Sequence, residues 1–453
     1  MIARLVAYWR LHSVSILLLL ACLGFYYVFA FLLQREDTIR LLSLYAALFF
    51  ICFKLIQFEK WNLRFLLAAG LLFRLVFLFE WPNLSQDFYR FIWDGRLILA
   101  GINPYLHTPD ELMSLADPTV SSLTELYNGM GSLSARNFSN YPPLNQLFFA
   151  LAAFIGGKGI TGPILAMRLI IITADLGVLY FGRKLLLKLN RSPHLIFWYF
   201  LNPLVIIELT GNLHFEGVML FFFIWSLYLA IGMRWGWAAI VYACSVALKL
   251  IPLIFLPLFI THFGFRRSIK FFLLVALAIL LISLPFAVPG VAGNYGSTLG
   301  LWFSNFEFNA GFYNLVKKTA VLFDSKPWEL IKAYGKIIPF LTIALVLVFT
   351  FFRNNRQPQI LLGSMMWVLS CYYLLSPTVH PWYISTLVLL CIYTDFRFPL
   401  FWSAVVVLSY SAYASPDYQE NLWLLAVEYF VVIGMMLYEI IRIRGDFFSI
   451  RKN

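Results

Sequence analysis

Four charged side chains occur within ten positions of the segment SQDFYRFIWDGR, residues 85–96, which follows a long apolar run. If the segment is helical, Asp87, Arg90 and Asp94 lie on one face, because residues three and four positions apart are neighbours on a helix. A carboxylate at a water–membrane boundary, beside aromatic rings and an arginine, can take a proton from a hydroxyl group. Asp87 is therefore the candidate general base. The structural alternative is that Asp87 caps the helix or pairs with Arg90.

The second acid of this segment, Asp94, precedes a glycine, and the pair is interpreted as structural, with Arg96 as the partner of Asp94. The sequence GINPY at 101–105 predicts a turn, because a proline ends a helix. The sequence YPPL at 141–144 predicts a helix start, where proline is favoured. The structural alternative for both motifs is that they only end or begin a helix and have no role in a site.

Cationic or hydrogen-bonding side chains near apolar segments are candidates for binding phosphate. Lys249 lies in the middle of VALKLIPL, where a charge in hydrocarbon costs several kcal/mol unless it reaches water or a partner. His214 and His380 each stand beside the expected end of a helix, and for each the alternative is an ordinary hydrogen-bonded histidine. The candidate phosphate ligands are Arg90, Lys249, His214 and His380.

Other charged residues within apolar segments are interpreted as structural. Arg168 and Asp175 lie seven positions apart in one expected span, and we expect them to form an intramembrane ion pair. Arg74, Glu208 and Glu428 are expected to have similar roles.

The composition excludes a soluble protein. Of the 453 residues, 61% are hydrophobic and 12% are charged, against about 25% charged in a typical soluble domain. The net charge of +12 fits cytoplasmic loops that face anionic lipid and does not indicate a nucleic-acid partner. The five cysteines lie in apolar runs without a CxxC or Cys/His spacing, so neither a disulfide framework nor a zinc site is expected.

Apolar segments of helical length follow one another along the chain. They cover residues 13–33, 41–58, 63–81, 142–156, 163–183, 194–210, 213–232, 236–260, 270–288, 335–352, 360–377, 381–395, 398–414 and 420–442. Two polar and aromatic stretches, 82–141 and 289–334, interrupt them. We expect a single integral membrane domain over residues 1–453, without a separate soluble domain.

Basic clusters give the expected orientation, because cytoplasmic loops are enriched in lysine and arginine. The clusters are Arg4 and Arg10; Lys60 and Arg64; Arg183, Lys184, Lys188 and Arg191; Arg266, Arg267 and Lys270; Arg353 and Arg356; and Arg442, Arg444, Arg451 and Lys452. All of these clusters are cytoplasmic if the segments 142–156 and 236–260 do not cross the membrane, so that each begins and ends on the same side of it. Both segments contain prolines, which are tolerated in broken or re-entrant helices that protein buries.

The resulting prediction is an all-α polytopic membrane protein with about twelve transmembrane helices, two broken or re-entrant segments and both termini inside. The stretches 82–141 and 289–334 are then outer loops, and the short connections 210–215, 376–382 and 415–421 are also outside. This orientation collects polar residues on the outer side. They are Asp87, Arg90, Asp94, His107, His214, Glu216, Glu307 and His380.

The motifs together resemble a known family. SQDFYRFIWDGRLILAGINPY is similar to the first outer loop of bacterial polyprenyl-phosphate-sugar-dependent glycosyltransferases of the GT-C fold, in particular their mannosyltransferase branch. Later landmarks of that family are resembled, in the same order, by NYPPLNQLFFAL (140–151), NPLVIIELTGNLHFE (202–216), ALKLIPLIFLP (247–257) and VHPWY (379–383). The resemblance covers nearly the whole chain. The sequence contains no GxxxxGK[ST], GxSxG or HExxH motif, so neither a P-loop nucleotide site nor a zinc peptidase is indicated.

The resemblance implies a GT-C-type bundle in the cytoplasmic (inner) membrane, with an active site that faces the periplasm or exterior. A sugar, mannose above others, would pass from a polyprenyl-phosphate donor to a glycan or glycolipid acceptor in one inverting displacement. Asp87 would activate the acceptor, and the candidate phosphate ligands would neutralise the leaving group. The supporting residues would be Asp94, Glu216, Tyr105 and Asn103.

This chain departs from the family pattern at Gln86, where the family usually has a second aspartate. The departure favours Asp87 as the base. It leaves at most a weakly held divalent metal, since a lone carboxylate binds Mg²⁺ or Mn²⁺ poorly, and no other cofactor is implied.

Two other classes of function stay open at this point. A lipid-linked sugar flippase or secondary transporter has repeat-related broken helices and ionisable groups at the bilayer midplane. The two broken segments of this chain do not occupy matching positions in two halves, and most of its polar groups lie at the expected outer mouth. A structural subunit fits the aromatic content but leaves the outer charges without a role.

Overall fold

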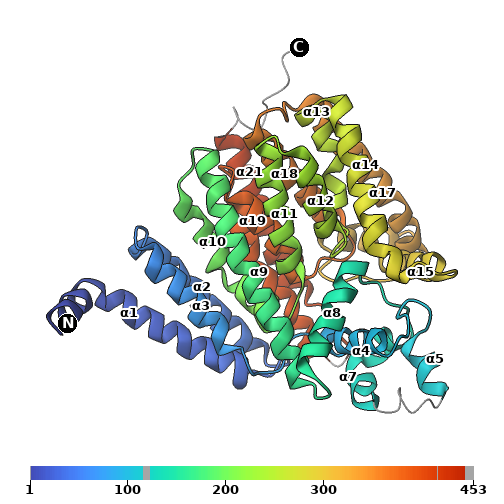
Figure 1. Ribbon diagram of the computed structural model, residues 1–453, viewed down its shortest axis with the longest axis horizontal. Helices are drawn as coiled ribbons and strands as arrows, with labels where there is room; N and C mark the ends of the chain where they lie inside the picture. The colour runs from blue at the N-terminus through green and yellow to red at the C-terminus, as the bar shows by residue number, and fades with distance from the viewer. Residues whose placement is uncertain (1, 116–122, 416, 444–453) are drawn as a thin grey trace.

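The computed structural model describes residues 2–115, 123–415 and 417–443, and the side chains of 2–7 and 302–304 are outside that description (Figure 1). Within these ranges the chain forms helices and no β-strand, and a β-bridge joins Phe308 to Thr378. The all-α prediction is therefore confirmed for the described residues. The predicted basic positions Arg444, Arg451 and Lys452 lie outside them.

Seven helices in the described part of the chain are long and apolar enough to cross a membrane. They are Tyr8–Phe31, Thr38–Phe58, Thr161–Lys188, Phe265–Phe286, Pro327–Phe352, Pro358–Leu375 and Leu422–Arg442. The pair Pro193–Phe200 and Val205–Gly211, bent by 61°, makes an eighth candidate. Other apolar helices have 10–17 residues, shorter than the roughly 20 needed to span the hydrocarbon core. A polytopic membrane protein is confirmed at this level, and the count of about twelve crossings stays a prediction.

The first half of the chain contains two groups of helices. The N-terminal group consists of α1 (Ile2–Phe31), α2 (Thr38–Phe58) and α3 (Leu63–Val76). The predicted outer loop 82–141 is itself largely helical and is followed by a short apolar helix: α4 (Asp87–Leu99), α5 (Pro109–Ser114), α7 (Thr124–Ala135) and α8 (Pro143–Gly156). These four gather at the lower end of the molecule in Figure 1, whereas α13 (Phe259–Phe263) lies at the opposite end.

The remaining helices form the central bundle and its far flank (Figure 1). The central part is α9 (Thr161–Lys188), η1 (Pro193–Ile196), α10 (Phe197–Phe200), η2 (Val205–Gly211), α11 (Glu216–Ile231), α12 (Trp235–Val246) and η3 (Ile251–Leu258). After α13 come α14 (Phe265–Ser283), η4 (Leu284–Phe286), α15 (Val291–Ser304), α16 (Gly311–Val321) and α17 (Pro327–Phe352). The last elements are α18 (Pro358–Leu375), η5 (Pro381–Tyr383), α19 (Ile384–Cys391), α20 (Phe398–Val405), η6 (Val406–Ala414) and α21 (Leu422–Arg442).

Two of the predicted apolar segments are not straight helices, and one predicted loop is partly helical. The segment 236–260 is broken, because α12 ends at Val246 and the 3₁₀ helix η3 begins at Ile251. The segment 194–210 bends between α10 and η2, a π-helix. The predicted loop 289–334 contains α15 and α16, and α17 already starts at Pro327, so the loop is shorter than expected.

The buried ion pair within the bundle differs from the expected one. Asp175 accepts from Arg74 Nε at 2.9 Å, and both side chains are fully buried. Arg168 instead donates to backbone carbonyls of two other segments. The predicted Arg168–Asp175 pair is therefore wrong, because a buried arginine on α3 reaches Asp175 from a neighbouring helix.

Candidate active site

Two of the four charges in the opening segment stabilise α4 itself. Arg90 Nε donates to Asp94 Oδ1 at 2.7 Å, one helical turn away, and both side chains are buried. Arg90 Nη1 also donates to the carbonyls of Ser134 (2.6 Å), in the last turn of α7, and Asn137 (3.0 Å), just after it. Arg90 therefore binds α4 to the end of α7, and its Nε and Nη1 donors do not face a ligand.

Asp94 completes this internal network. Its Oδ2 accepts from Ser139 Oγ at 2.6 Å and from Gln146 Nε2 at 2.8 Å, the latter on α8. Arg96 donates instead to the carbonyls of Lys158 and Gly159, so the expected Asp94–Arg96 pair is wrong. Residues two positions apart do not share a helix face, whereas Arg90 and Asp94 do. The alternative pairing of Asp87 with Arg90 is also wrong: the two share a helix face, but Arg90 pairs with Asp94 and with the carbonyls of Ser134 and Asn137 instead.

Asp87 stands apart from that network at the first residue of α4. Gln86 is the cap residue, and the amide of Asp87 donates to Ser85 Oγ at 3.3 Å. Burial raises the pKa of the Asp87 carboxyl above its usual value, the charge of Lys249 lowers it, and the charge of Glu216 raises it again. Asp87 is therefore a carboxylate of increased basicity within electrostatic range of a lysine and a second acid.

Lys249 lies in the break between α12 and η3. The carbonyl of Ala247, where α12 ends, accepts from the amides of Leu144 (3.0 Å) and Asn145 (3.4 Å) at the start of α8. The two proline-containing segments thus meet, and the free N–H groups of one helix start satisfy the broken end of the other. The break brings the lysine side chain to a partly exposed position, 24% accessible, instead of leaving it in a helix interior.

Glu216 is the direct partner of Lys249. Lys249 Nζ lies 3.0 Å from Glu216 Oε1 and 5.5 Å from the centre of the Tyr141 ring. Glu216 is the first residue of α11 and is nearly fully buried, and its Oε2 has no hydrogen-bond partner. An acid at a helix start is stabilised by the helix dipole. The second oxygen of Glu216 is thus available to a ligand.

The two candidate histidines enclose one indole ring. The His214 ring stacks on Trp382 at 3.8 Å between ring centres, and the His380 ring stacks on Trp382 at 4.4 Å. Phe308 extends the column by stacking on His380 at 5.0 Å. His214 and His380, 166 positions apart in the sequence, therefore belong to one aromatic stack.

Both histidines are neutral at physiological pH. Burial and the nearby charge of Lys249 lower the pKa of His380 to about 3. The same two causes, with His380 as a third, hold the pKa of His214 well below its usual range. Each neutral imidazole can donate one N–H to an anion, but neither brings a positive charge. Of the predicted phosphate ligands, Lys249 is then the cation whose charge acts on the candidate base.

The loop that carries His214 is held by Glu208 of η2. Glu208 Oε1 accepts from the Tyr410 hydroxyl at 2.7 Å, and its Oε2 accepts from Asn212 Nδ2 at 3.2 Å and lies 3.6 Å from His214 Nε2. Leu213, between Asn212 and His214, has a left-handed backbone (φ 63°), which costs a non-glycine residue about 1 kcal/mol. Strain of this kind is kept where the surroundings fix the conformation.

The predicted supporting residues of GINPY bind the segment after α4 to η4 and to the start of α8. Asn103 Nδ2 donates to the carbonyl of Phe286 at 3.2 Å, and the Tyr105 hydroxyl donates to the carbonyl of Tyr141 at 2.5 Å. Tyr105 is buried, and its ring meets Phe286 and Tyr295 edge to face. These contacts position Tyr141, whose ring lies beside Lys249.

Sequence reasoning missed two aromatic residues of this cluster. Tyr141 and Trp382 lie within the motifs YPPL and VHPWY, but only their prolines and histidine were interpreted. The signal was present, since an aromatic residue beside a proline-started helix is well placed to cover a charge. The cluster of Asp87, Tyr141, His214, Glu216, Lys249, His380 and Trp382 is called the outer site below.

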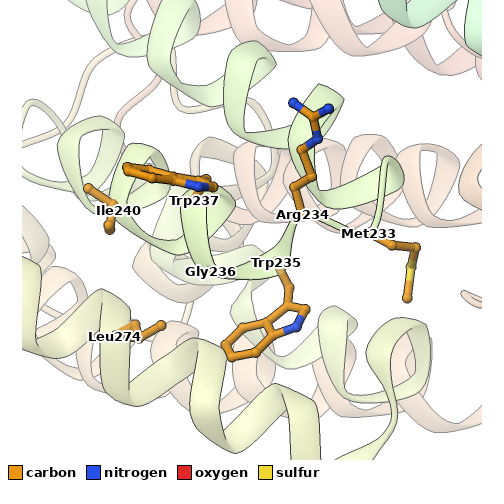
Figure 2. Close-up of a pocket in the computed structure, with 7 residues that line it drawn as sticks. All are labelled: Met233, Arg234, Trp235, Gly236, Trp237, Ile240 and Leu274. Carbon is orange, nitrogen blue, oxygen red and sulfur yellow. The ribbon is translucent and has the colours of Figure 1, made fainter.

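The outer site is distinct from a cavity on another part of the molecule. That cavity, of about 320 Å³, is lined by Met233, Arg234, Trp235, Gly236, Trp237, Ile240 and Leu274 (Figure 2). The indole of Trp235 points toward Leu274, and the guanidinium of Arg234 points to the opposite side (Figure 2). Among the described residues, no three His, Cys, Asp or Glu side chains form a set that could hold a metal ion.

Comparisons with known proteins identify a family that this chain matches. The family model described as Alpha-(1->6)-mannopyranosyltransferase, N-terminal domain, matches residues 4–264, more than half of the chain. That range includes Asp87, His214, Glu216 and Lys249 and ends before His380.

Two curated relatives carry names of the same kind. Alpha-(1->6)-mannopyranosyltransferase A of Mycobacterium tuberculosis is 23% identical over 324 residues, 67% of this chain and 60% of the relative. Alpha-(1->6)-mannopyranosyltransferase B of Corynebacterium glutamicum is 28% identical over 154 residues, 33% of this chain and 24% of the relative. The matches thus cover at most 60% of the length of either relative.

Proposed function

The chain belongs to the alpha-(1->6)-mannopyranosyltransferase family, and from this membership we propose that it transfers mannose from a polyprenyl-phosphate donor to a glycan or glycolipid acceptor. The proposed site is the outer site, and it faces the periplasm or exterior from the cytoplasmic membrane. The family match supports the mannosyl group, and the relatives' names support an α-(1→6) product.

The observation that carries the proposal is the grouping of a basic carboxylate with one lysine. Asp87 has a raised pKa, and its two charged neighbours are Lys249 and Glu216. A general base is efficient when its pKa approaches the working pH, which burial promotes for Asp87. Lys249 supplies positive charge on the same cluster, where a leaving phosphate needs it.

The reaction is written as one inverting displacement. The acceptor hydroxyl oxygen attacks C1 of the mannosyl donor, and the bond from C1 to the phosphate oxygen breaks. Asp87 takes the hydroxyl proton, and the polyprenyl phosphate leaves with the bonding electron pair. Lys249 Nζ and the N–H groups of the neutral histidines stabilise the charge on the departing phosphate oxygens.

The charge of the outer site favours a donor with a single phosphate. Lys249 is already shared with Glu216, both histidines are neutral, and Arg90 is bound to Asp94. A sugar linked to a prenyl chain through one phosphodiester carries one negative charge, which one lysine can match. A diphosphate donor would bring a further charge against two carboxylates.

The experiment uses membranes that contain the full chain, labelled polyprenyl-phosphate mannose and a lipid or glycan acceptor mixture. We expect transfer by the wild type and a loss of at least about 100-fold in Asp87→Asn, since an amide cannot accept the proton. The matched control is Asp110→Asn. Asp110 is another acid in the first turn of a helix, α5, and its carboxylate accepts from the Tyr127 hydroxyl. Asp110→Asn should transfer mannose at the wild-type rate.

Two results would overturn the proposal. Absence of mannosyl transfer by the wild type, with movement of the intact donor across the membrane, would assign the chain to transport. Full transfer by Asp87→Asn would remove Asp87 from the role of base.

A further inference from the structure

We infer that Arg168 of α9 is a positioning residue for the outer site, because it binds the two segments that carry Asp87 and His214. The guanidinium is fully buried and donates to four backbone carbonyls, two from each segment. The kinetic consequence rests on the proposed function, whereas the structural consequence does not.

The four hydrogen bonds divide evenly between the segments. Nη1 donates to the carbonyls of Leu78 (3.1 Å) and Glu80 (2.7 Å), just after α3. Nε donates to the carbonyl of Thr210 and Nη2 to that of Gly211, each at 2.9 Å, at the end of η2. Four of the five N–H groups of one side chain therefore hold the turn after α3 and the end of η2 together.

An arginine suits this task for two physical reasons. The last carbonyls of a helix lack partners within the helix and carry partial negative charge, so a cation that donates to them stabilises the helix end. The planar guanidinium directs its donors in fixed directions and can serve four acceptors at once, whereas a lysine ammonium offers three donors from one point. Arg168 thus caps the end of η2 and holds the turn after α3 against it.

Both segments lead into the outer site within a few residues. The first continues from Glu80 to Leu84, whose amide donates to Asn212 Oδ1 at 3.2 Å, and then to Asp87. The second continues from Gly211 through Asn212 to His214. Gly211 also lies directly against the Phe77 ring, where a Cβ atom would be 3.1 Å away. The position of the base relative to the His214–Trp382 stack is therefore set by one guanidinium and one amide.

The test uses the full chain in detergent micelles and the substitution Arg168→Lys, which keeps the charge. Hydrogen exchange followed by mass spectrometry should show faster exchange in both 78–90 and 205–216, although residue 168 lies on a third helix. The matched control is Arg74→Lys, since Arg74 is equally buried and binds Asp175 and the carbonyls of Gly70 and Phe200. Arg74→Lys should lower thermal stability, but it should not speed hydrogen exchange in 78–90 and 205–216 at the same time.

The second readout is kinetic and is normalised to folded, monodisperse protein. Arg168→Lys should lower kcat about 10- to 100-fold with little change in the KM for the donor, because misplacement of reacting groups by an ångström costs on that order. Arg74→Lys should keep kcat per folded molecule. If Arg168→Lys does not fold, Asn212→Ala, which removes the second tie, should give the same changes to a smaller degree.

The outcomes separate this inference from the proposed function. Unchanged exchange in either segment, or wild-type kcat in folded Arg168→Lys, would overturn the positioning role. A wild type that transfers no mannose, with both segments loosened in Arg168→Lys, would instead overturn the proposed reaction and leave the structural role of Arg168 in place.

Discussion

Lys249 Nζ lies 3.0 Å from Glu216 Oε1, and both partners of this ion pair act on the pKa of Asp87, which burial raises. The two partners act on Asp87 with opposite signs, because the lysine favours the charged carboxylate and the glutamate disfavours it. Neutralising one partner at a time therefore separates their effects on the candidate base.

The first prediction concerns the pH dependence of transfer. In Lys249→Met the Asp87 pKa rises further, so less of the carboxylate is ionised at a given pH and the acid limb of the rate moves to higher pH. In Glu216→Gln the pKa falls, and the limb moves to lower pH. Lys249→Met should also lower kcat by about 10² to 10³, since it removes a charge from the leaving group. Rate profiles with labelled donor measure both effects, and limbs that move in the same direction would contradict them.

The second prediction separates stacking from hydrogen bonding at His380. His380→Phe keeps an aromatic ring between Trp382 and Phe308 and removes the imidazole N–H. Because the histidine is neutral, the loss should be that of one hydrogen bond, about tenfold in transfer rate, with an unchanged apparent melting temperature. His107→Phe is the control from the predicted outer loop and should be neutral. A loss as large as that of Lys249→Met would show that His380 acts as a cation.

The third prediction tests the internal role of Arg90. Arg90→Met leaves the fully buried Asp94 carboxylate without its counter-ion, which typically costs about 3–5 kcal/mol. Thermal unfolding in detergent should show a large drop in apparent melting temperature. Arg96→Met, which loses hydrogen bonds to carbonyls only, should cost less. A stable Arg90→Met protein with a raised KM for the donor would return Arg90 to the predicted role of phosphate ligand.

The fourth prediction concerns the contact between α4 and α8. A Cβ atom on Gly95 would clash with the backbone carbonyl of Phe149, so Gly95→Ala has to push the helices apart. The expected cost is about 1–3 kcal/mol, as for other overpacked sites. Gly296→Ala on α15 is the control, because no atom lies within 4 Å of its added Cβ. Equal melting temperatures for the two variants would show that α4 does not depend on this close approach.

Much of the fold followed from hydropathy, and the departures have physical causes. The apolar run 236–260 was predicted as broken at its prolines, and α12 ends at Val246, because Pro252 has no N–H to donate to the carbonyl of Leu248 and its ring clashes with that carbonyl in a continuous helix. The run 194–210 was predicted as one span and is bent by 61° at a break that contains Pro203, because proline lacks the N–H that would continue the helix. Mean hydropathy does not distinguish such broken segments from straight ones.

The sequence predicted the residues of the candidate site better than it predicted which charged residues pair with each other. The order of motifs indicated Asp87, His214, Lys249 and His380, and the structure collects them. Charge pairing was harder, because sequence spacing reveals neighbours on one helix and not those on another. Arg90 and Asp94, four apart, follow the helical rule, whereas Asp175 is neutralised by Arg74, 101 positions away.

The carbonyl of Ala247, bound by the amides of Leu144 and Asn145, has a consequence for how the chain is made. Since α8 is translated long before α12 is complete, its leading amides have no acceptor there until residue 247 emerges from the ribosome. Unsatisfied backbone groups are costly in apolar surroundings. Nascent chains that end ahead of that residue therefore leave the start of α8 without this acceptor, and α8 completes its packing only after α12 has been made.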